Sequence, residues 1–138
     1  MTESDLFGVQ ALSDQLGYPL EIEDLKSSYH RISKDPYYAL FVAKDDHRKV
    51  LGWIQVRLDS KTLIHETYAE VAALVVDENH RGQGIGKLLL QEVEKWAQQK
   101  QVKTIRLLSN TKRTEAHRFY LREGYEILKT SNIFKKVF

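Results

Sequence analysis

The chain lacks cysteine altogether and carries little net charge. The absence of cysteine excludes disulfide scaffolds, cysteine nucleophiles, zinc ribbons and iron–sulfur clusters. Lysine and arginine number 21 against 19 aspartates and glutamates, and a net charge of +2 does not favour a nucleic-acid binder. No apolar run approaches the roughly 18 residues of a membrane span, and the polar start lacks the apolar region of a signal peptide. We therefore expect a soluble cytoplasmic protein without membrane or nucleic-acid partners.

Prolines and glycines are also few, and neither repeats nor a linker interrupt the 138 residues. A chain of this length with 42% hydrophobic residues can bury one core without a covalent or metal staple. The sequence therefore predicts a single domain over residues 1–138.

Hydrophobic periodicity predicts an alternation of helices and strands. Spacings of three and four predict helices over Leu6–Leu16, Glu21–Ser33, Ile85–Lys100 and Arg113–Glu123. Strand-forming residues predict strands over Tyr37–Ala43, Lys49–Leu58, Ile64–Val76, Val102–Leu108, Tyr125–Lys129 and Ile133–Phe138. This order indicates an α/β or α+β domain with a mixed sheet and a strand–helix–strand unit over residues 71–108.

The most informative stretch is a glycine-rich turn between a predicted strand and a predicted helix. Gly82, Gly84 and Gly86 allow the backbone to approach a ligand without interference from a Cβ atom. The first N–H groups of the following helix lack internal partners, and the helix dipole favours negative charge there. Arg81 and Lys87 add two cations. The turn is typical of a phosphate or diphosphate site.

Other motifs fit less well. A Walker A loop would need glycine where Arg81 stands and a hydroxyl where Leu88 stands, and a dinucleotide fingerprint would need different glycine spacing. A nucleotide phosphate-binding protein and a turn required only for packing stay open as alternatives. His65-Glu66 begins a zinc-protease motif, but Ala69 replaces its second histidine, so no metal site is predicted.

Two motifs resemble the GNAT superfamily of N-acetyltransferases. Arg81-Gly82-Gln83-Gly84-Ile85-Gly86 is similar to its acetyl-CoA loop, and Ala116-His117-Arg118-Phe119-Tyr120 followed by Gly124-Tyr125 is similar to a second conserved segment. The resemblance implies the GNAT fold. Family members usually open with a short strand, and here only the polar Met1–Asp5 precedes the first helix, so that strand is expected to be missing or very short.

The resemblance also implies where acetyl-CoA, the co-substrate, binds. Its pantetheine arm would pair with the backbone of Leu74, Val75 and Val76, one of whose N–H groups would polarise the thioester. Its diphosphate would bind the N–H groups of Gly82, Gln83, Gly84, Ile85, Gly86 and Lys87, with Arg81 nearby. His117 would hydrogen-bond the cofactor.

The expected reaction is direct transfer of the acetyl group to a primary amine in a ternary complex. Tyr120 would protonate the leaving thiolate, and Glu70 would be the base, by resemblance to the histone-acetylating branch. The alternative for Glu70 is a bound water. Tyr120 and Glu70 are thus the expected catalytic residues.

The acceptor stays open among polyamines, aminoglycosides, amino acids, and the terminal or lysine amines of proteins. A second class of function, a non-catalytic module that binds or senses acyl-CoA, also stays open. The apolar pairs Ile133-Phe134 and Val137-Phe138 would form an exposed edge strand, which predicts a homodimer.

Overall fold

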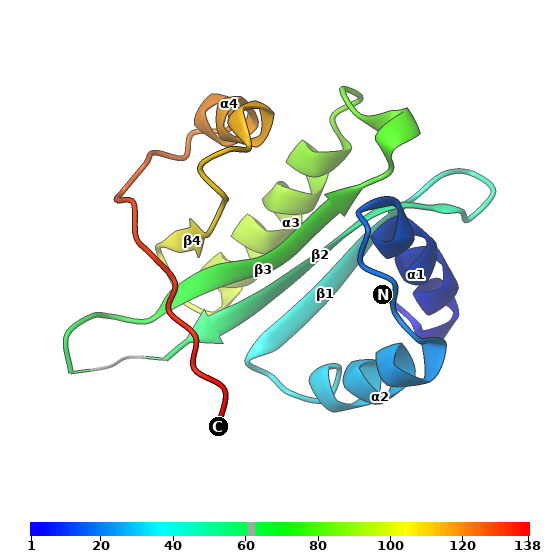
Figure 1. The fold of residues 1–138 in the computed structure, drawn as a ribbon, viewed down its shortest axis with the longest axis horizontal. Coiled ribbons are helices and arrows are strands. Elements are labelled where there is room, and N and C mark those ends of the chain that lie inside the picture. Colours follow the sequence, from blue (N-terminus) through cyan, green and yellow to red (C-terminus); the bar gives the residue numbers. More distant parts are fainter. Residues whose placement is uncertain (61–62) are drawn as a thin grey trace. The chain divides into compact units, whose positions relative to one another are not determined.

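The computed structural model describes residues 1–60 and 63–138. The chain forms two compact units, Met1–Leu107 and Leu108–Phe138, and each is described by itself. The first unit contains η1 (Glu3–Asp5), α1 (Leu6–Gln15), α2 (Ile22–Ile32), β1 (Tyr38–Lys44), β2 (Val50–Asp59), β3 (Tyr68–Val76), η2 (Glu78–His80), α3 (Ile85–Gln99) and β4 (Ile105–Leu107). The second unit contains α4 (Thr114–Arg122) (Figure 1).

The strands of the first unit form one mixed sheet in the order β1-β2-β3-β4. β1 with β2 and β2 with β3 are antiparallel, whereas β3 with β4 is parallel across the crossover through α3. The predicted mixed sheet and strand–helix–strand unit are confirmed.

Helices cover both faces of this sheet. Adding a Cβ atom to Gly52 of β2 would bring it within 3.1 Å of Ile85 and 3.2 Å of Leu89, so Gly52 faces α3. The next residue, Trp53, pairs with Val75, which packs in one core cluster with Leu12 of α1. Successive strand residues point to opposite faces, so α1 and α3 lie on opposite sides of the sheet. Figure 1 shows α1 and α3 separated by the strands in this way.

The first strand, expected to be missing or very short, is absent before α1 in the described residues, where Glu3–Asp5 forms a single 3-10 turn. Asp5 is 5% exposed and accepts hydrogen bonds from Thr2 N at 2.7 Å and Lys44 Nζ at 2.7 Å. Burial alone would raise the pKa of Asp5, but the Lys44 and Thr2 contacts outweigh it and hold the pKa below its usual value. An ion pair between the buried Asp5 and Lys44 of β1 thus holds the start of the chain against the sheet.

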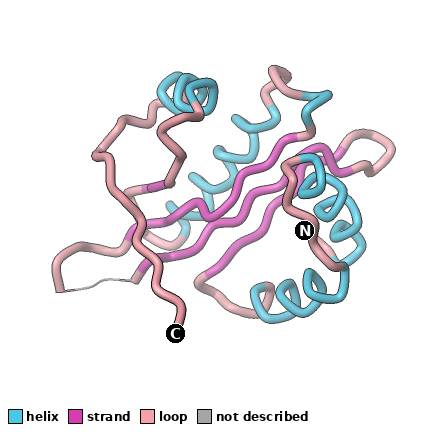
Figure 2. Tube along the Cα trace, viewed as in Figure 1, coloured by secondary structure: helices cyan, strands magenta, loops and turns pink. Residues whose placement is uncertain are grey.

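Four predicted helices and the first two predicted strands are confirmed to within one residue at each end, but the other strands need correction. β3 begins at Tyr68 and not at Ile64, and β4 spans only Ile105–Leu107 of the predicted 102–108. The predicted strands over 125–129 and 133–138 are wrong: this segment follows α4 without strand structure, as Figure 2 shows. Apolar β-branched and aromatic residues favour an extended chain, but a strand also requires a hydrogen-bonded neighbour.

Candidate functional site

The glycine loop (residues 81–86) connects η2 to α3 with two residues in the left-handed region. Gly82 has φ +77° and Gly84 has φ +82°, and a Cβ atom at either position would have no neighbour within 4 Å. Glycine is therefore required here by backbone conformation and not by packing. The open space above both residues leaves the loop backbone accessible.

The start of α3 presents backbone donors to the same space. The N-cap is Gly84, which has no side chain to satisfy these donors, and the first intrahelical bond runs from Leu88 N to Gly84 O at 3.1 Å. The N–H groups of Ile85, Gly86 and Lys87 therefore precede the hydrogen-bond ladder. Ile85 is 8% exposed and anchors the helix in the core. The predicted anion-binding residues thus lie together on one turn, with Arg81 and Lys87 exposed beside it.

Asp77, between β3 and the loop, was missed by the sequence analysis. It is 2% exposed; its Oδ1 accepts hydrogen bonds from Gln15 Nε2 at 3.1 Å and Asn79 N at 3.2 Å, and its Oδ2 lies 3.0 Å from His80 Nδ1. Gln15 Oε1 in turn accepts from Glu78 N at 3.2 Å. The end of α1 thereby fixes the turn that leads into the glycine loop. An aspartate directly after a strand and two residues before an asparagine is a capping signal that could have indicated this role.

Asp77→Asn is expected to lower the free energy of unfolding by about 1–3 kcal/mol, since buried donors lose a charged acceptor. Burial would raise the pKa of Asp77, but the bonds from Asn79, Gln15 and His80 together hold it below its usual value. A lowered folded-state pKa stabilises the protein above about pH 4, and this stabilisation is lost as the pH falls further. In urea unfolding between pH 3 and pH 7, the free energy of unfolding should fall less steeply with decreasing pH for Asp77→Asn than for the wild type. The exposed Asp14→Asn serves as control, and equal profiles for both variants would contradict the assignment.

The edge of β3 opens next to the glycine loop. β3 pairs with β2 as far as Val76, but its pairing with β4 spans only Ala69, Glu70 and Val71. Directly after this section, Ala72 is an extra residue that has no partner in β2, which defines a β-bulge. A bulge bends its strand and increases its twist, and here it coincides with the separation of β3 from β4. Residues 72–76 therefore present a strand edge that is able to pair with an amide-bearing ligand.

Leu74, Val75 and Val76, which the sequence analysis assigned to the pantetheine arm, lie on this edge. Their side chains belong to the protein interior: Val75 is 8% exposed and packs in the cluster with Leu12 and Val50, while Leu74 and Val76 are half-buried on the other face. Any contact with a ligand would therefore use their backbone groups.

A cross-strand cluster lies on the α1 face of the sheet at the point where β3 and β4 separate. In register, Glu70 pairs with Arg57 of β2 and Arg106 of β4, and Tyr68 pairs with Asp59. Arg57 Nη2 donates to Glu70 Oε2 at 3.1 Å, and the Tyr68 hydroxyl donates to Asp59 Oδ2 at 2.8 Å. The Arg106 guanidinium lies 4.3 Å from the centre of the Tyr68 ring. Charged and aromatic side chains from three strands thus share one small area.

These contacts keep the cluster in defined protonation states. The hydrogen bond and the charge of Glu70 raise the pKa of the Arg57 guanidinium, and the bond to Asp59, then burial, raises the pKa of the Tyr68 phenol. Both groups therefore keep their protons at neutral pH. The sequence analysis found Glu70 but missed Arg57, Asp59 and Arg106, because cross-strand register is not readable from one strand.

Glu66 precedes β3, whereas Glu70 lies within it. The side chain of Glu70 is 15% exposed and held by Arg57. Glu70 is therefore the carboxylate that the sheet positions at the open edge.

The second unit contains the other predicted residues. Tyr120 and Phe119 on α4 have ring centroids 5.2 Å apart, and Tyr120 lies 5.9 Å from Tyr125. Burial raises the pKa of the Tyr120 phenol against the opposing charge of Arg113, so the group is protonated at neutral pH. His117 Nε2 donates to the carbonyl of Asn110 at 2.9 Å, which fixes the ring at the start of α4.

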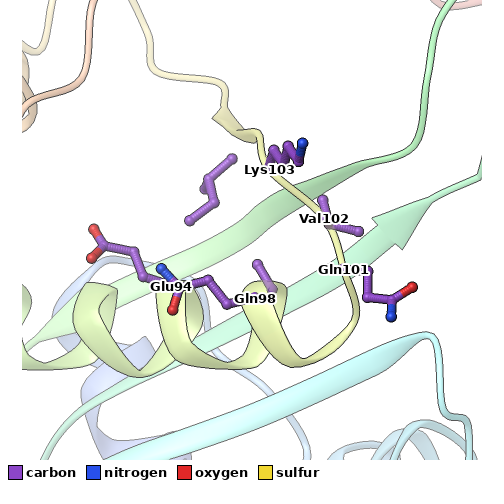
Figure 3. A pocket seen from close by; sticks show the side chains of 7 residues that line it. Glu94, Gln98, Gln101, Val102 and Lys103 are labelled. Carbon is purple, nitrogen blue, oxygen red and sulfur yellow. The ribbon is translucent and has the colours of Figure 1, made fainter.

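A hollow of about 600 Å³ lies at the other end of α3, where the chain turns into β4. Figure 3 shows its lining side chains, which come from Glu94, Ala97, Gln98, Gln101, Val102, Lys103 and Ile105. A helix of 15 residues spans about 22 Å, so this hollow is remote from the glycine loop. It includes none of the candidate residues.

Two further features concern residues 1–60 and 63–138. No helix there is long and apolar enough to cross a membrane. Nor do any three histidine, aspartate or glutamate side chains of that part of the chain group as ligands of a metal ion.

Comparison with known proteins places the chain beside acetyltransferases. A sequence model of the acetyltransferase (GNAT) family matches residues 8–125. An aminoalkylphosphonate N-acetyltransferase of Salmonella typhimurium is 40% identical over 78 residues, which cover 56% of this chain and 51% of that protein. A streptothricin acetyltransferase of Escherichia coli is 28% identical over 102 residues, or 69% of this chain and 59% of that protein. The matches thus span only about half the length of these curated relatives.

The fold has solved counterparts as well. The crystal structure of an aminoglycoside 6′-N-acetyltransferase from Acinetobacter baumannii superposes with a TM-score of 0.86 over 100% of this chain and 95% of that one. The two sequences are 18% identical, so this likeness establishes the fold alone.

Proposed function

The chain belongs to the acetyltransferase (GNAT) family, and we propose on that basis that it transfers the acetyl group of acetyl-CoA to a primary amine. The observation that carries the proposal is the junction of an accessible glycine loop at the start of α3 with the open edge of β3. An anion cradle beside an unpaired strand edge fits a ligand that has both a diphosphate and an amide-bearing arm.

Acetyl-CoA would bind along these two features. The diphosphate would accept hydrogen bonds from the N–H groups of residues 82–87, with Arg81 beside it. The pantetheine amides would pair with the backbone of Leu74, Val75 and Val76, and one of these N–H groups would polarise the thioester carbonyl. His117 is proposed as a further cofactor contact.

The transfer needs one deprotonation and one protonation. The acceptor ammonium loses a proton to Glu70, directly or through water, and the neutral nitrogen attacks the thioester carbon in a ternary complex. The carbon–sulfur bond breaks as the carbon–nitrogen bond forms, and Tyr120 gives its proton to the departing thiolate. The amine's second proton restores the phenol, and Glu70 releases the first proton to water. The products are the acetamide, free CoA and one proton.

The energetics of the last step are compatible with a phenol. A thiol has a pKa near 8.5 and a tyrosine near 10, so transfer to a free thiolate runs uphill by about 1.5 units or 2 kcal/mol. Burial of Tyr120 increases this difference. The phenol would therefore act while the carbon–sulfur bond is breaking, when sulfur carries only part of its charge.

The acceptor is proposed to be a small molecule. The names of the relatives suggest aminoalkylphosphonates, streptothricin-like compounds and aminoglycosides as the classes to test first. Terminal and lysine amines of proteins are the second class of acceptor. An acyl-CoA-binding module without turnover is the rival function.

A screen for free CoA release decides between these functions. The protein is incubated with acetyl-CoA and a panel of amines, with an amine-free control for simple thioester hydrolysis. We expect amine-dependent release for at least one member. Calorimetry with acetyl-CoA, ATP and NAD⁺ runs in parallel, and tighter binding of ATP or NAD⁺ would overturn the proposal. Acetyl-CoA binding without release for any amine would favour the rival module.

Two properties of the whole chain are also proposed. The two compact units would form one acetyltransferase domain, since the family match runs across their boundary.

The chain would form a homodimer through apolar C-terminal residues such as Phe134 and Phe138, which are 91% and 107% exposed. A monomer by light scattering at high micromolar concentration would overturn the dimer.

A further inference from the structure

Building on the proposed function, we infer that the acceptor is a compact amine with an anionic group of its own, a phosphonate or carboxylate. The cross-strand cluster would bind it, with the anion on the Arg106 guanidinium and the amine toward Glu70. This inference comes from the charges and contacts of the cluster.

The position of the cluster makes it accessible to an acceptor. Glu70 directly precedes Val71, the last residue of β3 that pairs with β4, so the cluster borders the open edge where the thioester would lie. The Arg57 side chain is 46% exposed, and Tyr68, Glu70 and Arg106 are half-buried. A ligand at this place could therefore reach both the charged side chains and the edge.

The two arginines differ in how their charge is compensated. Arg57 is paired with Glu70 at 3.1 Å. Arg106 forms no ion pair with any carboxylate among the described residues, and its guanidinium is held by the Tyr68 ring at 4.3 Å. A cation–π contact uses the charge of a guanidinium and leaves its N–H donors for other partners. A planar fork of donors suits phosphonate and carboxylate oxygens.

The carboxylates of the cluster are engaged in complementary ways. Asp59 accepts the Tyr68 hydroxyl, which supports the ring under Arg106. Glu70 Oε2 is bonded to Arg57, and no side chain of the described residues donates to Oε1, which would face the ammonium group of the acceptor. The cluster thus holds two cations and two anions, a balance that complements a zwitterion. A polycationic acceptor would instead place several ammonium groups against two guanidinium groups, which is unfavourable.

Matched acceptors test this assignment in the full-length protein. Steady-state CoA release is measured with 2-aminoethylphosphonate, β-alanine, propylamine and kanamycin, for the wild type and for Arg106→Gln and Arg106→Lys. We expect kcat/KM for one of the two anionic amines to exceed that for propylamine at least about 10-fold. Arg106→Gln should remove this preference through a higher acceptor KM, with the KM of acetyl-CoA unchanged. Arg106→Lys should restore part of it.

The matched control is Lys100→Gln, because Lys100 is a second cation over an aromatic ring, 5.9 Å from the centre of Trp96 on α3. Lys100→Gln should leave kcat/KM unchanged for every acceptor. The comparison of 2-aminoethylphosphonate with β-alanine shows which anion the Arg106 guanidinium prefers. Preference for propylamine or kanamycin, or an equal loss for all amines in Arg106→Gln, would overturn the inference while the acetyltransferase proposal stands. No CoA release with any amine would overturn both.

Discussion

Tyr120→Phe is expected to reduce amine-dependent CoA release at least about 100-fold, while acetyl-CoA binding stays within about twofold of the wild type. The substitution removes one hydroxyl group and retains the ring that contacts Phe119 and Tyr125. A positioned general acid contributes about 10²–10⁴-fold to a rate, and the proposed cofactor contacts do not use the Tyr120 side chain. Release is measured at saturating amine, and binding is measured by calorimetry.

Tyr125→Phe is the matched control, because it removes a hydroxyl group from the neighbouring ring. It should keep most of the activity. Since burial holds the pKa of Tyr120 above its usual value near 10, the phenol should stay protonated throughout the neutral range. Unchanged thiol release in Tyr120→Phe would remove this residue from the mechanism, and equal losses in both variants would indicate a structural role.

Gly84→Val should weaken acetyl-CoA binding by about 100-fold. A β-branched residue at φ +82° is strained by about 1–3 kcal/mol, so the loop is expected to change conformation and its N–H groups to diverge. Loss of two charge-assisted hydrogen bonds at about 1.5 kcal/mol each gives about 3 kcal/mol, or about two orders of magnitude in Kd. Calorimetry with acetyl-CoA measures the change.

Gly17 provides an unusually close control for this experiment. It has φ +77°, and a Cβ atom added there would have no neighbour within 4 Å, as at Gly84, but it follows α1 and lies outside the glycine loop. Gly17→Val should cost similar stability in urea unfolding and leave acetyl-CoA binding intact. If both variants bind acetyl-CoA as the wild type does, the glycine loop is not the diphosphate site.

The helices could be predicted from sequence because their signals are local. The stripe that begins at Ile85 and the stop at Gly124 lie within a few residues of the elements they define. The strands at the end of the chain could not be predicted in the same way. Ile133 and Phe134 favour an extended backbone, but whether that backbone becomes a strand depends on pairing that local sequence does not encode.

The residues of the candidate site differ in the same way: some have a local sequence signal, and others depend on contacts between elements. The glycine loop was found because its conformation needs glycine at Gly82 and Gly84, and that need is visible in the sequence. Asp77 and Arg106 were missed because their roles arise from contacts with Gln15 and Tyr68, on other elements. The bulge at Ala72 was also missed, and it changes which residues share a face with Glu70.

Pairing between β3 and β4 ends next to the extra residue Ala72. The separation of the two strands therefore coincides with a feature of the backbone and does not depend on one side chain. Substitutions along this strand that preserve size and apolar character are expected to leave the proposed cofactor edge intact. Deleting Ala72 is expected to damage the proposed cofactor edge far more than replacing it, because deletion removes the bulge itself.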